Sequence, residues 1–370
     1  MVASVTGLNR YRRIVVKVGS ALLIEGGALR RAWLTRLCSD IANLKSAGAE
    51  VVLVSSGAVA LGCPVLGLDR AKLSLAQKQA CAAAGQSRLT RAYDDALGAF
   101  GLRSAQALLT LDDTEDRRRW LNARAALRTL VDAGVVLVVN ENDTVATAEI
   151  RYGDNDRLAA RTAQMIGADM LVLLSDVDGL YTADPRLDSV AEHIPVVERL
   201  TDDVLAMGGE ANKRGGVGSG GMATKLLAAR ICMDSGCDMI VCDGRPDNPL
   251  GRLAGGARHS LFKSQADPIS ARAQWIRGSL APSGRFVVDQ GAQNALGDGR
   301  SLLAAGLVSV SGTFSKGDTV CVVGADGCEI AHGLSAYDSP DLPPLCGLRS
   351  DEIDHPYGPV VIHRDNLVML

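Results

Sequence analysis

Short apolar runs alternate with longer stretches of helical spacing over the first two thirds of the chain. The apolar runs predict buried strands at residues 14–18, 51–54, 135–139, 170–174 and 239–242. The intervening pattern predicts helices at residues 33–47, 71–97, 112–133 and 156–166, the third opened by a capping box of Asp112 and Glu115. Continuous apolar strands separated by helices are typical of a mostly parallel sheet. We therefore expect an α/β fold in which helices sandwich this sheet.

The pattern changes after Asp243. Residues 244–256 are rich in Gly and Pro and predict a loop, and residues 269–276 predict a short helix. Short strands with tight turns between them follow, at residues 286–288, 307–310, 319–323, 329–331 and 360–362. We expect one domain over residues 1–265, a linker with a short helix over 266–281, and a small, mainly β domain over 282–370.

Polar residues follow several of the predicted strands. Lys17 lies near the end of the first strand, and the clusters 55–57, 140–143 and 175–176 come directly after later strands. In open α/β sheets, ligands bind beyond the carboxyl ends of the strands. The sequence therefore predicts a binding site at this edge, although solvated loops are the simpler alternative.

The stretch from Gly215 to Lys225 is nearly all glycine until Met222, where a helical pattern begins that stops at Gly236. A glycine loop that leads into a helix offers free backbone N–H groups and the positive end of the helix dipole to an anion. A lysine in the first turn, such as Lys225, is unfavourable unless an anion is bound there. The stretch thus predicts a phosphate site, although its spacing is not that of a P-loop. A flexible surface loop before an ordinary helix is the alternative.

Composition and charge narrow the class of protein. The chain has 370 residues, is 47% hydrophobic and carries a formal net charge of −3, which argues against general affinity for nucleic acid or anionic membranes. The run after Arg13 is broken by Lys17, so it does not resemble a signal peptide, and no window approaches the ~20 apolar residues of a membrane span. We expect a soluble cytoplasmic protein.

The nine cysteines and five histidines show no metal-binding spacing such as C-x-x-C or H-E-x-x-H. An odd number of scattered cysteines fits a protein of a reducing compartment. The usual role of such cysteines is to serve as small buried residues of the core. We therefore expect no metal ion held by a dedicated set of protein ligands.

With these motifs in place, nearly the whole chain resembles the bacterial glutamate 5-kinase family, in which an amino acid kinase domain precedes a PUA domain. The matching segments of the first domain are residues 15–19, 54–58, 140–143, 152–156, 175–181 and 218–225. Those of the second are residues 288–292, 301–303, 312–318 and the ending 362–367. Ser55 and Ser175 stand where the family often has threonine, and both retain the hydroxyl group.

The resemblance implies that the chain uses ATP to phosphorylate the γ-carboxylate of L-glutamate, the first step of proline biosynthesis. It implies Mg²⁺ held mainly by ATP phosphates and water rather than by protein ligands. It also implies feedback inhibition by proline and a homo-oligomer, dimer or tetramer. Since no reductase domain follows, the product would pass to a separate glutamyl phosphate reductase.

This chemistry needs positioned charges rather than a base. The nucleophilic carboxylate is already ionised at pH 7, so catalysis rests on orientation and on cations around the transferred group. The resemblance implies that Lys17 and Lys225 contact the phosphates. Lys17 could instead be a solvated lysine at a strand end. Asp156 is the candidate for holding both lysines, and it could also cap the helix that it opens.

The remaining candidate residues fall into two sets. For the amino acid, Asp143 is expected to meet the α-ammonium group, with Asn140, Asn155 and Asp154 beside it, while Ser56 and Gly57 take a carboxylate. For ATP, besides Lys17 and Lys225, the candidates are Ser175, Asp176, Ser219, Gly220, Gly221, Met222, Ala223 and Thr224.

Two alternatives stay open. The chain could act on N-acetylglutamate, aspartate, carbamate or a nucleoside monophosphate, as other members of the same kinase superfamily do. It could also bind RNA through its PUA-like domain. Residues 281–370 hold five Arg and Lys against eleven Asp and Glu, a net charge of −6, which disfavours RNA and favours a structural or regulatory role.

Overall fold

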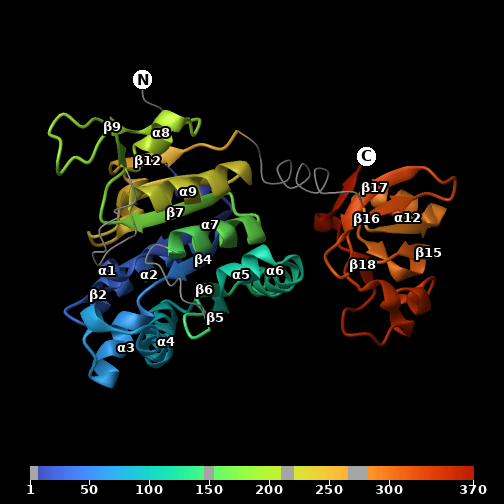
Figure 1. The fold of residues 1–370 in the computed structure, drawn as a ribbon, viewed down its shortest axis with the longest axis horizontal. Coiled ribbons are helices and arrows are strands. Elements are labelled where there is room, and N and C mark those ends of the chain that lie inside the picture. Colours follow the sequence, from blue (N-terminus) through green and yellow to red (C-terminus); the bar gives the residue numbers. More distant parts are fainter. Residues whose placement is uncertain (1–6, 146–153, 210–220, 266–281) are drawn as a thin grey trace. The chain divides into compact units, whose positions relative to one another are not determined.

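The structure is a computed structural model of the chain, and it describes residues 7–145, 154–209, 221–265 and 282–370. The chain forms two compact units (Figure 1). The first comprises residues 1–115 and 123–268, and the second comprises residues 269–370 together with the short segment 116–122. The segment 266–281, with its predicted short helix, lies outside the described residues. The domain boundaries expected at its two ends therefore stay predictions.

The first unit is built on an eight-stranded sheet. Its strands are β1 (Arg13–Val18), β4 (Glu50–Ser55), β5 (Ser104–Leu109), β6 (Val136–Glu141), β7 (Met170–Ser175), β10 (Val196–Val197), β11 (Asp238–Asp243) and β12 (His259–Phe262). Their spatial order is β10-β12-β11-β7-β1-β4-β6-β5. All neighbours run parallel except β11 and β12, so the predicted mostly parallel sheet is confirmed.

Helices and short hairpins connect these strands. The helices are α1 (Ser20–Leu23), α2 (Arg31–Ser46), α3 (Ala58–Leu66), α4 (Leu75–Gly98), α5 (Leu111–Glu115), α6 (Arg117–Asp132), α7 (Asp154–Ile166), α8 (Asp202–Ala206), α9 (Met222–Asp234) and α10 (Pro249–Ala254). The paired short strands are β2 (Ile24–Glu25) with β3 (Ala28–Leu29), and β8 (Leu180–Tyr181) with β9 (His193–Ile194).

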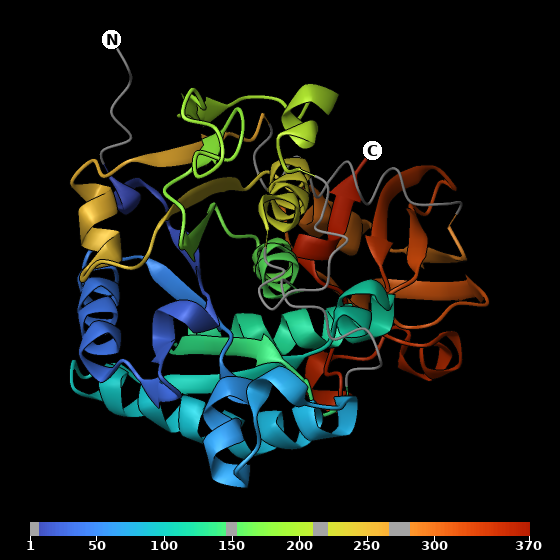
Figure 2. The ribbon, with the colours of Figure 1, turned by 60° about the vertical axis from the view of Figure 1, so that its left-hand side comes forward.

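Alternate residues of β1 pack on opposite faces of the sheet. Ile14, Val16 and Val18 belong to one core cluster with α2 and α4, in which Trp33 and Tyr93 are the largest buried side chains. The other face is covered by α7, which packs against β1, β4, β6 and β7, and by α9, which packs beside α7. Figure 2 shows α7 and α9 nearly end-on and next to one another. Because Lys17 alternates with Val16 and Val18, its side chain lies on the face covered by α7.

Helices α3 and α4 cross at two glycines. A Cβ atom added at Gly62 would lie 1.8 Å from the carbonyl oxygen of Cys81, and one added at Gly85 would lie 1.8 Å from that of Ala58. The two backbones can approach this closely only without side chains at these positions. The crossing fixes α3, which begins directly after Gly57, against α4.

The second unit contains a five-stranded sheet in the order β15-β13-β16-β17-β19 and a two-stranded sheet, β14-β18. Its elements are β13 (Gly284–Val288), α12 (Gln290–Gly297), β14 (Leu302–Leu303), β15 (Leu307–Gly312), β16 (Thr319–Val323), β17 (Glu329–Leu334), β18 (Val360–Ile362) and β19 (Leu367–Met369). Its core packs around Phe286, Phe314, Tyr337 and Leu342. The prediction of a small, mainly β domain is confirmed, although α12 was not foreseen.

Short 3₁₀ helices complete both units. They are η1 (Leu8–Arg10), η2 (Arg70–Lys72), η3 (Ala304–Gly306), η4 (Ser339–Asp341), η5 (Pro343–Leu345), η6 (Ser350–Glu352) and η7 (Arg364–Asn366). None of the helices in the described part of the chain has the length and apolar character needed to cross a membrane.

Two helix predictions were wrong in detail. The single helix expected from Asp112 is divided into α5 and α6, and the reciprocal capping bonds lie two residues earlier. The Thr110 backbone N–H donates to Asp113 Oδ2 at 2.7 Å, and the Asp113 N–H donates to Thr110 Oγ1 at 3.2 Å. Similarly, α7 begins at Asp154, so Asp156 is its third residue and does not cap the helix.

The loop predicted over residues 244–256 contains helix α10 instead. The backbone N–H groups at its start are capped by a residue far away in the sequence. The buried carboxylate of Asp40 on α2 accepts hydrogen bonds from Leu250 N at 3.0 Å and Gly251 N at 3.1 Å. The sequence pattern also missed β5 and the antiparallel strand β12, which follows the strand predicted to be the last.

The α3–α4 crossing makes a prediction about stability. Gly85→Ala should destabilise the protein by about 1–3 kcal/mol, because the new methyl group overlaps the Ala58 carbonyl and the helices must separate. Gly98→Ala in the same helix is the matched control, since a Cβ there meets nothing within 4 Å, and it should be neutral or stabilise by up to about 1 kcal/mol. Urea denaturation of both variants measures the difference. Equal midpoints would contradict the close crossing.

Candidate active site

Two lysines and one aspartate from three separate elements meet on the α7 face of the sheet. Lys17 Nζ of β1 lies 2.5 Å from Asp156 Oδ1 of α7, and Lys225 Nζ of α9 lies 3.0 Å from Asp156 Oδ2. Each oxygen of the carboxylate therefore pairs with a different ammonium group. The structure thus brings together the three residues predicted to be catalytic.

All three side chains are buried, with Asp156 fully enclosed and Lys17 and Lys225 9% and 5% exposed. Burial alone would raise the pKa of Asp156, but the charges of Lys17 and Lys225 outweigh it and lower the pKa to about 2. The carboxylate is therefore ionised at neutral pH. The trio carries one net positive charge, which a bound anion would neutralise.

Helix α9 begins beside this trio. Its N-cap is Gly221, which offers no side-chain acceptor, so the first backbone N–H groups of the helix receive no capping hydrogen bond from it. In the first turn, Thr224 Oγ1 donates to Asp156 Oδ2 at 3.2 Å, while Met222 and Ala223 precede it. Ser219 and Gly220, also predicted to bind ATP, lie outside the described residues. The start of α9 and Lys225 together form the positive end of the site.

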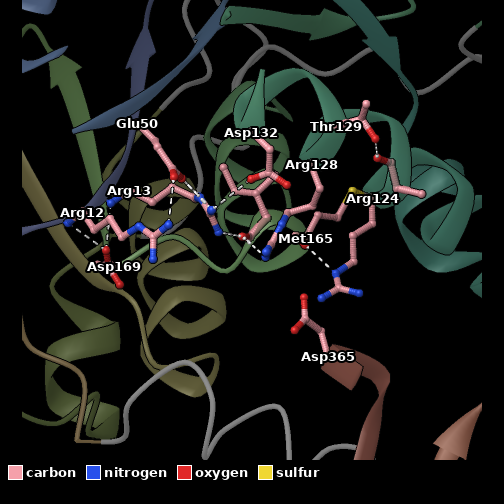
Figure 3. A network of polar contacts seen from close by, with 12 residues as sticks. Arg12, Arg13, Glu50, Arg124, Arg128, Thr129, Asp132, Met165, Asp169 and Asp365 are labelled. Carbon is pink, nitrogen blue, oxygen red and sulfur yellow. Dashed lines mark hydrogen bonds and ion pairs between the residues drawn. The ribbon is translucent and has the colours of Figure 1, made fainter. Parts of the chain in front are cut away.

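The opposite end of α7 is held by arginines (Figure 3). Arg124 Nε donates to the Met165 carbonyl oxygen at 3.0 Å, and Arg128 donates to that of Ile166 at 3.1 Å. The buried guanidinium of Arg13 donates to the same Ile166 oxygen and, through Nε, to Glu50 Oε2 at 2.6 Å. Cations at a helix C-terminus complement its dipole and satisfy its last carbonyl groups. They fix the helix that carries Asp156.

A row of hydrogen-bonded amides lies beyond β4 and β6. Asn155 Nδ2 donates to Ser56 Oγ at 2.5 Å and to Asn140 Oδ1 at 3.1 Å, and Asn140 Nδ2 donates to Gln86 Oε1 at 2.8 Å. Asn155 Oδ1 is buried and has no hydrogen-bond partner within the described part of the chain. This row brings together three of the residues predicted to bind the amino acid, and it leaves an acceptor available for an N–H donor of a ligand.

Gly57 joins the same region. It follows β4 with a φ of +122°, a conformation that L side chains rarely adopt, and a Cβ there would lie 2.9 Å from Ile24 Cδ1. The preceding Ser55 is fully buried, and its hydroxyl accepts a hydrogen bond from Tyr93 Oη at 2.9 Å. The turn that presents Ser56 and Gly57 is therefore held from behind by α4.

The other candidates lie at the same edge of the sheet. Asp143 is half-buried in the turn that follows β6, and Asp154 is the first residue of α7. Ser175 ends β7, and its hydroxyl donates to Oδ1 of the exposed Asp176 at 3.1 Å.

Three residues of this region were not foreseen from the sequence. Gln86 and Tyr93 lie inside the long helix α4, where nothing in the local pattern separates them from their neighbours. In the sequence, Arg13 stands out only as the residue before an apolar run, yet its side chain is buried and contacts the end of α7. Their roles depend on contacts with residues far away in the chain, so only the folded structure reveals them.

Comparison with known proteins matches the chain to two protein families. The model of the Amino acid kinase family matches residues 12–243, and that of the PUA domain matches residues 284–357. The chain is 52% identical to Glutamate 5-kinase of Paracoccus denitrificans (strain Pd 1222), covering 100% of both chains. It is 55% identical to Glutamate 5-kinase of Caulobacter vibrioides (strain NA1000 / CB15N), covering 97% of this chain and 96% of that one. The chain belongs to the glutamate 5-kinase family.

This finding confirms the resemblance drawn from the motifs. The chain is also 52% identical to Glutamate 5-kinase of Rhizobium etli (strain CIAT 652), covering 98% of this chain and 94% of that one. Among solved structures, carbamate kinase from Giardia lamblia bound to AMP-PNP is 16% identical and covers 69% of this chain and 99% of that one. Its TM-score is 0.48, a likeness too distant to inform on substrate.

The buried trio makes a prediction about stability and pH. Asp156→Asn should destabilise the protein by about 3–5 kcal/mol at pH 7, because two buried ammonium groups lose their counter-charge. The pKa is lowered from about 3.9 in an unfolded chain to about 2, so the stabilisation is complete above about pH 5 and is lost as the pH falls towards 2. Urea denaturation should show the gap between wild type and variant narrowing by about 1 kcal/mol at pH 3.

Asp247→Asn is the matched control for this prediction. Asp247 is an exposed carboxylate whose nearest cation, Arg36, lies 3.9 Å away, and such surface pairs contribute about 0–1 kcal/mol. A similar small effect from both substitutions would contradict a buried bridging role for Asp156.

Proposed function

We propose that the chain catalyses ATP-dependent phosphorylation of the γ-carboxylate of L-glutamate to γ-glutamyl 5-phosphate, the first step of proline biosynthesis. Family membership over both units supports this reaction. The single observation that carries it is the pair of buried lysines held by Asp156 at the start of α9. Two fixed cations at a helix N-terminus suit a polyphosphate, and a carboxylate acceptor needs no base.

In the proposed reaction, an oxygen of the substrate γ-carboxylate attacks the γ-phosphorus of ATP. The bond between that phosphorus and the oxygen bridging to the β-phosphate breaks, and ADP leaves with the electron pair. Because the nucleophile is already ionised, no proton moves in this step. The difficulty is the approach of one anion to another, which Lys17 and Lys225 ease by placing positive charge on both sides of the transferred group.

Asp156 acts here as a positioning residue. Its two oxygens are paired with the two lysines and its pKa is low, so it takes up no proton at neutral pH. An ammonium group offers three N–H donors, so each lysine would also donate to phosphate oxygens in the proposed complex. Replacing the Asp156 carboxylate would therefore displace the two ammonium groups and also lower the stability of the fold.

We further propose that the amide row binds glutamate. The side chains of Asn140 and Asn155 suit the polar groups of an amino acid, since Asn155 Oδ1 has no hydrogen-bond partner among the described residues. Asp143 and Asp154 would supply negative charge for the ammonium group. Ser56 and Gly57 would take a substrate carboxylate through the hydroxyl group and backbone N–H groups. Ser175 and Asp176 would face the nucleotide, together with the residues 219–224.

The residues present fit Mg²⁺ carried by the nucleotide. The Asp156 carboxylate is paired with the two lysines, which suits an ion held mainly by phosphate oxygens and water. When bound, Mg²⁺ would neutralise charge that develops between the β- and γ-phosphates.

Three further parts of the proposal concern regulation and assembly. We include inhibition by proline, transfer of the product to a separate glutamyl phosphate reductase, and a dimer or tetramer. All three rest on family membership alone. RNA binding by the second unit is not proposed, because residues 281–370 carry a net charge of −6.

The reaction is tested by ADP release from MgATP with L-glutamate, with the acyl phosphate trapped by hydroxylamine as a hydroxamate. Aspartate, N-acetylglutamate, carbamate and UMP serve as competing acceptors, each with and without proline. We expect turnover with glutamate alone, suppressed by proline. Turnover only with another acceptor would overturn the substrate, and turnover unaffected by proline would remove the proposed inhibition.

The role of Lys225 is tested by Lys225→Ala. We expect kcat to fall by roughly 10²–10³-fold with a much smaller change in the KM for glutamate, because the lost charge acts mainly in the transition state. Lys263→Ala, which removes an exposed lysine of the same unit, should leave both constants near wild type. A kcat that stays within twofold for Lys225→Ala would exclude this role.

The role of Asp143 is tested by Asp143→Ala. Loss of the carboxylate should raise the KM for glutamate at least tenfold. The KM for MgATP should change little, because the ammonium group that Asp143 would bind belongs to glutamate and not to ATP. Steady-state kinetics with each substrate varied in turn measure both constants. An unchanged KM for glutamate would remove Asp143 from the substrate site.

A further inference from the structure

Three side chains with metal-binding atoms lie on one face of the β16–β17 pair in the second unit. Cys321 of β16 is directly opposite His332 of β17 in the antiparallel register. Directly opposed residues have Cβ atoms about 4.5–5.5 Å apart, so their side chains can meet. This face points away from the core of the unit, because the neighbours Val320 and Val322 belong to the core cluster.

A bulge adds a third residue to this face. In a regular strand, residues three positions apart point to opposite faces, which would separate Glu329 from His332. Here the register shifts between Val322 and Val323, so that Val323 pairs with Glu329 rather than with Ile330. The extra residue returns Glu329 to the face that carries Cys321 and His332.

The donor atoms of the three side chains converge. The Cys321 Sγ atom, a carboxylate oxygen of Glu329 and a ring nitrogen of His332 all lie within 4.8 Å of one another. Thiolate, imidazole and carboxylate are the ligands that Zn²⁺ uses in proteins, at about 2.0–2.3 Å from the ion. Small rotations of the side chains would bring all three to these distances. Among the described residues, this is the cluster of Cys, His, Asp and Glu with such a geometry.

His332 supplies an independent indication of a ligand. Its Nε2 atom is buried and has no hydrogen-bond partner in the part of the chain that the structure describes. The nearest carboxylate oxygen, Glu329 Oε2, is 3.7 Å away, which is beyond hydrogen-bond distance. Buried ring nitrogens are nearly always paired, since leaving one unpaired destabilises the fold. A bound cation would satisfy this atom.

We propose that Cys321, Glu329 and His332 bind a divalent cation of the zinc class, with water as a further ligand. The burial of the three groups suits an ion near the surface: Cys321 is 4% exposed, while the side chains of His332 and Glu329 are 18% and 53% exposed. Glu329 thus leaves one side of the cluster open to solvent, where water completes the coordination. The site is separate from the kinase chemistry and needs no part of it.

The charges around the cluster have opposing effects. Arg285, next to Cys321 in the register of β13 and β16, repels a cation, but its guanidinium is turned to the Gly327 carbonyl oxygen at 3.3 Å. The net charge of −6 over residues 281–370 attracts one. Cys321 is a free cysteine, and a thiol must lose its proton to bind a metal ion. Binding forms the metal–thiolate bond and releases that proton to solvent.

Titration of the untagged full-length protein with Co²⁺, followed by zinc competition, tests this proposal. Cobalt bound to a thiolate gives a sulfur-to-metal charge-transfer band, which reports the thiolate contact without any measurement of kinase activity. We expect one band that saturates at one equivalent of Co²⁺ and disappears when Zn²⁺ is added. A folded protein that shows no such band at saturating Co²⁺ would overturn the site.

Variants assign the band to the cluster. Cys321→Ser should abolish it, whereas Cys328→Ser, which changes an exposed thiol seven residues away, should leave it unchanged. Because Cys321 is buried and its variant could fail to fold, Glu329→Gln provides a second test at an exposed side chain. It should retain the band while weakening Co²⁺ binding at least tenfold. A band that survives in folded Cys321→Ser, disappears in Cys328→Ser, or keeps its affinity in Glu329→Gln would contradict the assignment.

Discussion

Asp156 holds two buried lysines, and the arrangement of the first unit depends on this shared ion pair. A buried lysine is strongly unfavourable without a counter-charge, and one carboxylate here serves both β1 and α9. Its position is fixed by the packing of α7 on the sheet and by the arginines that hold the end of that helix. Displacement of α7 would therefore separate the lysines from their common partner, so the fold and the charge of the site are coupled.

An ion pair that is fixed by the fold suits phosphoryl transfer to a carboxylate. Such a reaction needs no proton acceptor, and its barrier comes from bringing two anions together. A site for it requires cations that are fixed before the substrates arrive, since charges that must reorganise stabilise a transition state less. The amide row of Ser56, Asn140 and Asn155 adds neutral, directional groups nearby. In the proposed reaction, the charged groups would face the phosphates and the neutral hydrogen-bonding groups would face the amino acid.

Much of this could be predicted from the sequence, because the signals are local. Three signals can be recognised within a few residues of the sequence. They are Lys17 near the end of a strand, the polar residues at the ends of β4 and β6, and the glycine-rich stretch that precedes α9. What the pattern missed depends on distant partners. Helix α10 is capped by Asp40 of α2, and Gln86 contacts Asn140 from inside a long helix. The bulge that turns Glu329 towards His332 also has no local signature, because one extra residue in a strand is visible only in its pairing.

A crystal structure of the protein with MgADP, L-glutamate and aluminium fluoride, a planar mimic of the transferred phosphoryl group, tests the central claim most directly. The account predicts that Lys17 and Lys225 each donate to the mimic or to the oxygens beside it, while Asp156 still pairs with both lysines. The γ-carboxylate of glutamate should lie in line with the mimic. A mimic bound away from both lysines, or an Asp156 that leaves them to coordinate Mg²⁺, would contradict it.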